Sequence, residues 1–182
     1  MYPRIKKVPN PRTYDDNSKS ILEFANDMQN KSLINAYEID LVKGKIDDQY
    51  AILTCINKAT RELYAKITKP NSIDVKYNLE KIIDENQLEI KQLIIDNSSE
   101  NVCLNEIESI GQIYRCQPYC SSDKGQIENV HRLLRYWIKK RTSIDLINQK
   151  TLDIVVEKIN NYPRRVFDND KLMSAMEFRN QI

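Results

Sequence analysis

The sequence predicts an α/β domain with a mixed five-stranded sheet flanked by helices. Three short, largely apolar runs at 37–42, 50–56 and 62–67 are separated only by polar turns, which predicts an antiparallel meander. Farther along the chain, strand-like runs alternate with segments of helical period, as expected when parallel strands are joined by helices. The length of 182 residues and the hydrophobic content of 41% are sufficient for one domain with a core.

The segment before the sheet is predicted to lie outside the core. We expect residues 1–36 to form a basic arm and a short helix, and residues 37–182 to form the core with its C-terminal helices. The first 19 residues are rich in Pro, Lys, Arg and Asp and have no apolar period, so we expect an extended basic arm there. A short helix is expected from Ser20 to Met28.

After the meander, the remaining elements follow from caps and periodicity. Ser72 is the predicted N-cap of a helix from Ile73 to Glu85. The almost continuously apolar run at 90–96 is typical of a strand that is buried on both faces. The later elements are expected at 100–110 (short helix), 112–116 (fifth strand), 125–140 (helix) and 149–160 (helix). Hairpin strands, a helix and then alternating strands and helices describe an RNase H-like core.

Three carboxylates stand out because of their local settings. Asp40 lies inside an apolar strand-like run, Asp96 closes the run Leu93–Ile95, and Glu128 lies at the start of a helical stretch. An acid at the end of a buried strand is costly to desolvate unless it is paired or binds a metal. Two strand acids and one helix acid are the ligands expected in a phosphoryl-transfer site that binds two Mg²⁺ or Mn²⁺ ions. Taken alone, a strand Asp is more often a turn former or a salt-bridge partner.

The helix after Gly125 is amphipathic. At 100° per residue, its polar side chains fall on one face and apolar side chains on the other. This stripe has two readings, an ordinary solvated face or a track for DNA phosphates that leads to Glu128. His131 could help to position DNA, but the helical pattern favours a surface histidine. The polar face consists of Glu128, His131, Arg132, Arg135 and Lys139.

Composition excludes several classes. The four cysteines form no Cys-x-x-Cys pair, and Cys116, Cys120 and His131 lack a fourth zinc ligand nearby, so reduced thiols are expected. No apolar run of membrane-spanning length and no secretory leader are visible, so we expect a cytoplasmic protein without membrane contact. The net charge of only +2 says little about nucleic acid.

Four stretches together resemble a known family. They read YEIDLVKGK around Asp40, LIIDNSSE around Asp96, YRCQPYCSSDKGQIENVHRLLRYWIKKRTS around Glu128, and INNYPRRV at 159–166. They resemble the catalytic core of DDE insertion-sequence transposases of the IS-thirty family, which is similar to the core of retroviral integrases. The third stretch is the most specific, and the separation of 32 residues (128 − 96) between Asp96 and Glu128 is close to that of the family.

The resemblance implies an RNase H-like integrase core in which Asp40, Asp96 and Glu128 are the catalytic and metal-binding residues. It implies two Mg²⁺ or Mn²⁺ ions, DNA as the partner at the element ends and at the target, and a homo-oligomer assembled on DNA. The expected function is Mg²⁺-dependent cleavage and transfer of DNA strands during transposition. The residues expected to contact DNA are Lys43, Lys45, Asn129, His131, Arg132, Arg135, Lys139, Arg164 and Arg165.

The chain also departs from the family pattern. Ile39 stands where a small residue is usual, Ser98 replaces a Gly, and Asn101 replaces an aromatic residue. If the turn after Asp96 requires a left-handed residue, Ser98 would strain it. Only about 36 residues precede the first core strand, and no DNA-reading helices are visible among them. An alternative is therefore a truncated, non-catalytic fragment that binds DNA or a full-length transposase and regulates it. A metal-dependent nuclease with the same fold is a third reading.

Overall fold

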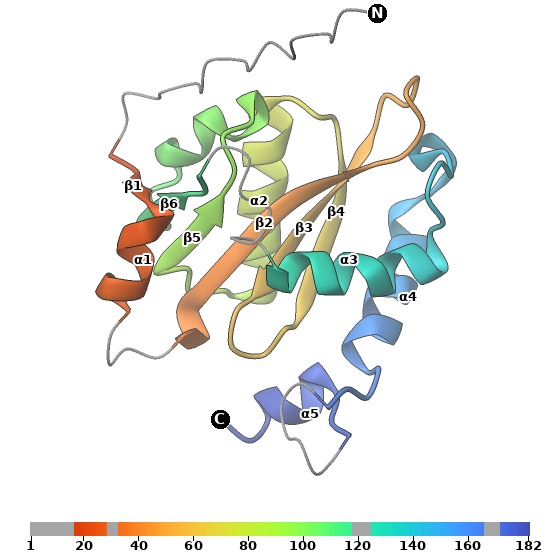
Figure 1. The fold of residues 1–182 in the computed structure, drawn as a ribbon. Coiled ribbons are helices and arrows are strands. Elements are labelled where there is room, and N and C mark those ends of the chain that lie inside the picture. The colour runs from red at the N-terminus through yellow and green to blue at the C-terminus, as the bar shows by residue number, and fades with distance from the viewer. Residues whose placement is uncertain (1–16, 29–32, 118–124, 166–171) are drawn as a thin grey trace, which may run out of the picture.

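The computed structural model describes residues 17–28, 33–117, 125–165 and 172–182. Residues 1–16 of the predicted arm (1–19) and the motif residues around Tyr119 and Cys120 lie outside these ranges. Figure 1 shows a sheet with helices on both sides. The strands are β1 Lys19–Ser20, β2 Ala36–Lys43, β3 Ala51–Asn57, β4 Leu63–Thr68, β5 Gln92–Ile95 and β6 Gln112–Arg115. The α-helices are α1 Ile21–Asp27, α2 Ser72–Asn86, α3 Gly125–Trp137, α4 Gln149–Asn160 and α5 Ala175–Arg179. Three 3₁₀ segments are η1 Leu33–Asn35, η2 Ser99–Glu106 and η4 Ile144–Leu146.

The sheet is mixed, as predicted, but has six strands in the order β1-β6-β5-β2-β3-β4. Strands β2, β3 and β4 form the antiparallel meander, and β2–β5, β5–β6 and β1–β6 pair in parallel. The prediction of five strands was wrong because Lys19 and Ser20 pair with Tyr114 and Arg115. A two-residue strand has no periodicity to detect, so only its tertiary partner defines it. The architecture is compatible with an RNase H-like fold.

Strand β2 divides two cores because its side chains alternate between the faces of the sheet. Tyr37 and Ile39 pack on the α2 side, with Leu79 and Ile82 of that helix. Val42 faces the other side, where Ile52 and Ile56 of β3 meet α3 and α4. In Figure 1, α3 crosses in front of the strands and α2 lies behind them. The residues with even numbers in β2 therefore face α3, and these include Glu38 and Asp40.

The helix boundaries agree broadly with the sequence, with three corrections. Asn71, not Ser72, caps α2, because the Asn71 side chain accepts the N–H of Asp74. The segment predicted as a short helix at 100–110 is the 3₁₀ segment η2. The third helix ends at Trp137, three residues earlier than predicted. Among the described residues, no helix combines the length and the apolarity that crossing a bilayer requires.

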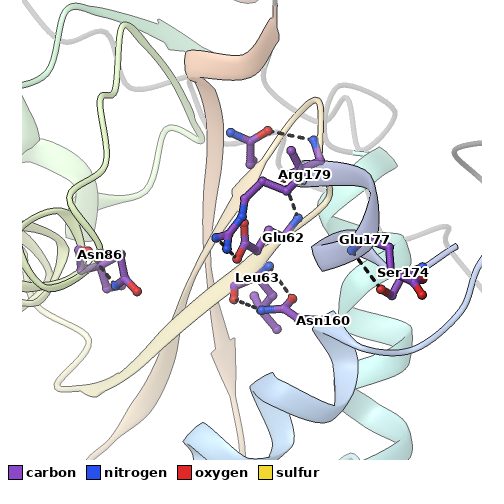
Figure 2. A network of polar contacts seen from close by, with 10 residues as sticks. Glu62, Leu63, Asn86, Asn160, Ser174, Glu177 and Arg179 are labelled. Carbon is purple, nitrogen blue, oxygen red and sulfur yellow. Dashed lines mark hydrogen bonds and ion pairs between the residues drawn. The ribbon is translucent and has the colours of Figure 1, made fainter. Parts of the chain in front are cut away.

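Side-chain amides of α4 cover the outer edge of the sheet. Asn160 accepts the N–H of Leu63 (2.8 Å) and donates to its C=O (2.9 Å), and Gln149 accepts the N–H of Ile67 (2.9 Å). These bonds satisfy backbone groups of β4 that would otherwise be available to pair with another chain. Figure 2 shows Asn160 and Leu63 at this edge, with Arg179 of α5 on Glu62 (2.8 Å) nearby. The C-terminal helices thus close the sheet beside β4.

Asn160→Ala should lower the free energy of unfolding by about 2–3 kcal/mol, because it leaves a buried N–H and a buried C=O of Leu63 without partners. Urea denaturation followed by circular dichroism would measure this as a lower midpoint with an unchanged slope. The neighbouring Asn161→Ala is the matched control, since the Asn161 side chain is exposed and donates to the carbonyl oxygen of Glu157 one turn earlier (3.0 Å). Equal effects of the two changes would contradict the edge-covering role.

Candidate active site

The first turn of α3 is anchored to the centre of the sheet by Glu38. This side chain is only 1% exposed, forms an ion pair with Lys58, and accepts the backbone N–H of Ile127 (3.2 Å). A carboxylate at a helix N-terminus is favourable because the unpaired N–H groups there carry partial positive charge. Glu38 therefore sets the position of the helical turn that carries Glu128.

Asp40 lies one pleat farther along the same face, beside His131. The Thr54 hydroxyl donates to the Asp40 carbonyl oxygen (2.8 Å) and also contacts His131 Nε2 (2.9 Å). On the other side of the ring, Nδ1 of His131 faces Asp40 Oδ2 at 3.7 Å. The interpretation of His131 as a surface histidine was wrong. The helical pattern shows the polar face but not that the sheet covers part of it.

Asp96 is held by its own turn. Its Oδ1 accepts the backbone N–H of Ser98 (3.0 Å) and the side-chain amide of Asn101 (2.7 Å). Asn97 donates to the carbonyl oxygen of Cys116 (2.8 Å), which ties the turn to the end of β6. The departure at Asn101 thus has a structural role, since this buried amide fixes the Asp96 carboxylate.

The expected strain at Ser98 does not occur. Ser98 has φ −74° and ψ 153°, an extended conformation that any residue adopts. The described residues with positive φ lie elsewhere, at Arg61, Gln87 and Arg141. The substitution of Gly by Ser therefore leaves the turn after Asp96 unstrained.

The strand register brings two of the three acids toward the carboxyl ends of the neighbouring strands β2 and β5. Glu38 pairs with Ile94 in the parallel ladder of β2 and β5, so continuing by two residues brings Asp40 opposite Asp96. Neighbouring strands are about 4.8 Å apart. Glu128 is exposed on the first turn of α3, three residues before His131 and thus on the same side of the helix.

The described residues do not form a closed metal-ligand set. Within them, no three His, Cys, Asp or Glu side chains lie close enough together to hold a metal ion. Within the described conformation, Asp96 Oδ1 is engaged by its own turn, and Glu128 is exposed on α3. The donor chemistry is nevertheless all oxygen, which suits Mg²⁺ or Mn²⁺. The metal role of the three acids stays a prediction.

The predicted DNA contacts fall into two groups. Arg132, Lys139, Lys45 and Arg165 are exposed on the surface, and so is Asn129, which accepts a hydrogen bond from Arg132. Arg135 is instead half-buried, where it donates to the carbonyl oxygen of Lys43 (2.7 Å) and burial lowers the pKa of its guanidinium. Arg135 thus joins α3 to the end of β2.

Two further residues that were predicted to contact DNA, Lys43 and Arg164, already interact with other parts of the protein. Lys43 pairs with Glu100 (2.9 Å). Burial is the largest single influence on the pKa of Glu100 and raises it, but the hydrogen bonds to Glu100 and the charge of Lys43 together lower the net pKa. Arg164 is half-buried where its backbone pairs with Met173, and burial together with nearby Arg61 lowers its pKa to about 10.

The loop after β2 is fastened to the segment that follows α3. Asp48 accepts the hydroxyl of Ser143 (2.6 Å) and the backbone N–H groups of Ile144 (2.8 Å) and Lys45 (2.8 Å), and the Ser143 bond is the largest cause of its lowered pKa. A Cβ on Gly44 would lie 2.5 Å from the carbonyl oxygen of Thr142, so only glycine fits this close approach. The loop that carries Lys45 is therefore held beside the C-terminal end of α3.

Comparison with known proteins gives related sequences over most of the chain. A probable transposase for the insertion-like sequence element IS1161 of Streptococcus salivarius is 33% identical over 165 residues, which cover 90% of this chain and 47% of that protein. A putative integrase of a Spiroplasma virus is 31% identical over 153 residues, which cover 80% of this chain and 47% of that protein. The chain is a relative of insertion-sequence transposases. Transposase InsI for element IS30A of Escherichia coli is 27% identical over 152 residues, 82% of this chain and 39% of that protein.

These comparisons confirm the recognition of insertion-sequence transposases from the sequence motifs, and the IS30 relative agrees with the family expected. No family model matches the chain. The chain spans less than half the length of these three relatives, between 39 and 47%.

Sequence reasoning missed the residues that support the acids. The sequence predicted no role for Glu38, Lys58 or Thr54, and Asn101 stood out only as a departure from the family pattern. A buried acid two residues before Asp40 was the available signal, because an acid on the core side of a strand needs a partner. The identity of that partner, Lys58, could not be inferred from sequence spacing.

Glu38→Gln should lower the free energy of unfolding by about 3 kcal/mol, because it leaves the largely buried Lys58 ammonium without its counter-ion. Chemical denaturation would measure this effect, and adding Lys58→Met should restore part of the lost stability. The control is Glu106→Gln, which removes the exposed ion pair with Lys76 and should change stability by less than about 1 kcal/mol. A loss for Glu38→Gln no larger than for the control would contradict the anchoring role.

Ser98→Gly should not stabilise the protein. At an extended position, Gly gains no relief of strain and enlarges the conformational freedom of the unfolded chain, so a loss of about 0.5–1 kcal/mol is expected. Thermal or urea unfolding measures the sign directly. A gain in stability would mean that the turn adopts a left-handed conformation in solution.

Proposed function

We propose that this chain carries the catalytic core of an insertion-sequence transposase, which cleaves a DNA strand at the end of the element and joins it to a target strand. The observation that supports this most directly is the strand register, which brings Asp40 and Asp96 to one edge of the sheet, beside the helix that carries Glu128. Transposases of insertion elements are related over most of the chain, which favours this chemistry over that of other α/β domains.

In this proposal, Asp40, Asp96 and Glu128 hold divalent ions jointly. The ions would supply charge stabilisation at the scissile phosphate and would increase the acidity of the attacking hydroxyl, first of water and then of the freed 3′-OH. The protein's own part is to position the acids. Glu38 holds the turn of Glu128, Thr54 and His131 hold Asp40, and Asn101 holds Asp96.

The exposed cations are proposed to bind the DNA backbone. Arg132 and Lys139 lie on α3, and Lys45 lies on the loop fastened beside the end of that helix. Contacts of this kind carry no sequence information, so they would orient DNA on the acids without selecting its sequence. Assembly of two or more copies on DNA belongs to the same proposal.

A regulatory role is the second candidate. The specific observation in its favour is that the described residues form no three-ligand metal group. A protein of this kind would bind DNA, or a longer transposase, without cutting. A nuclease that uses the same acids would cut without joining, and the products of the reaction distinguish it.

Asp40→Asn, Asp96→Asn and Glu128→Gln should each weaken Mn²⁺ binding and abolish Mg²⁺-dependent nicking, because each removes a charged oxygen ligand while preserving side-chain size. Isothermal titration with Mn²⁺ and a nicking assay on supercoiled DNA carrying the flanking element ends would measure the two effects. Joined products would indicate a transposase, and cut but unjoined products a nuclease.

The control for this test is Asp84→Asn, an exposed acid of α2 on the opposite face of the sheet. It should leave both Mn²⁺ binding and nicking unchanged. Salt-sensitive DNA binding without nicking, together with Mn²⁺ binding that none of the three changes reduces, would reject the catalytic proposal and favour the regulatory one.

A further inference from the structure

Two hollows meet on the outer surface of α3. One has a volume of about 430 Å³ and is lined by Glu128, His131 and Arg135, with Arg132 and Tyr136. The other has a volume of about 560 Å³ and lies between α3 and α4, where Arg132 and Tyr136 line it together with Trp137 and Tyr162. Arg132 and Tyr136 belong to both, so they form the wall between the candidate acids and the second hollow.

The second hollow is rich in exposed aromatic rings. Tyr136 is 76% exposed, Tyr162 53% and Trp137 45%. The rings of Tyr136 and Trp137 pack edge to face, with centroids 5.4 Å apart and planes at 83°. Such a concentration of solvent-exposed aromatic surface around one cavity is unusual for a side of a protein without a ligand or partner. We refer to this hollow as the aromatic pocket.

Its charge favours an anionic ligand. Among the described residues, those that line the aromatic pocket include Arg132 and no Asp or Glu. The ammonium of Lys158 lies 4.5 Å from the centroid of the Trp137 ring. Flat aromatic walls beside cations suit a nucleotide, because its base stacks on the rings and its phosphate pairs with the cations. The cavity volume is also within the range of small-molecule sites.

We propose that the aromatic pocket binds one unpaired nucleobase of the DNA strand whose backbone lies at the candidate acids. The inference rests on the proposed function, because it is the DNA at Glu128 that places a nucleotide next to the shared wall. Arg132 binds the phosphate that joins the nucleotide at the acids to the one in the pocket. Trp137 and Tyr136 provide the stacking surface, and Asn129, which also lines the pocket, offers an amide to the edge of the base.

This arrangement would select for unpaired DNA close to the cleavage position. A base that is still paired cannot enter a pocket beside the duplex without unstacking, which costs free energy. A strand whose end is already unpaired avoids that cost. The aromatic pocket would therefore favour frayed or single-stranded ends over fully paired ones, whatever their sequence.

The single tryptophan of the chain, Trp137, makes the test direct. The full chain would be titrated, in EDTA to prevent cleavage, with a blunt DNA duplex and with the same duplex extended by three unpaired nucleotides at one 3′ end. We expect the extended duplex to bind about tenfold more tightly, the equivalent of one stacked base, and to quench Trp137 fluorescence. The blunt duplex should bind with strong salt dependence and little quenching.

Variants locate the effect, with binding followed by the anisotropy of labelled DNA. Tyr136→Ala and Trp137→Ala should each remove most of the preference for the extended duplex, whereas Trp137→Phe, which keeps a ring, should retain most of it. The matched control is Tyr77→Ala, which removes an exposed ring paired with Lys81 at 4.5 Å on α2 and should change nothing. Unchanged melting temperatures would establish that the variants are folded.

Three outcomes would overturn the inference. Tight, salt-dependent binding of both duplexes without a preference would reject the aromatic pocket as a base site and leave the proposed function intact. Failure to bind any DNA would reject both. The third outcome would assign the pocket to a second copy of the chain instead. In that case Trp137 fluorescence would respond to protein concentration but not to DNA, and Trp137→Ala would dissociate a dimer of the chain.

Discussion

The buried ion pair of Glu38 and Lys58 lies where the central strand of the sheet meets helix α3. Glu38 lies in the central strand, is almost fully buried, and accepts a backbone N–H from the first turn of α3. A charge in such a place is retained only with a partner and with hydrogen bonds, and Glu38 has both. The position of α3, and with it of Glu128, His131 and Arg132, depends on this contact.

Beyond this contact, the turns that follow β2 and β5 satisfy their backbone polar groups locally. The turn after β5 uses Asp96 and Asn101, and the loop after β2 uses Asp48. Each turn also contacts a distant segment, through Asn97 to β6 and through Asp48 to the residues after α3. Each loop is therefore tied by polar contacts to a segment distant in the sequence, which is the kind of support that a catalytic site needs.

The same helix serves two different surfaces. Residues of α3 that face the sheet, Val130 and Leu134, close the core beside β3. Those that face outward connect the hollow of Glu128 to the aromatic pocket through Arg132 and Tyr136. Because both surfaces belong to one helix, substitutions in the core below α3 would shift the side chains that line both hollows.

Much of the fold was predictable because it follows from local periodicity. The meander, the buried strand that ends before Asp96, and helices α2, α3 and α4 were expected within a few residues of where they lie. The motif residues also led to the correct class of relatives. The supports of the site were not predictable. Lys58 is 20 residues from Glu38, and Asn160 is 97 residues from Leu63, so only the packed structure pairs them.

The sequence by itself determined the order of the longer elements and the relationship to transposases, because these depend on patterns within short stretches. Tertiary structure decided the sixth strand, the partial burial of His131 and Arg135, the extended conformation of Ser98, and the meeting of two hollows at Arg132 and Tyr136. The physical reason is the same in each case. A side chain's environment is set by segments that are close in space but distant in sequence, and no local pattern records which segments those are.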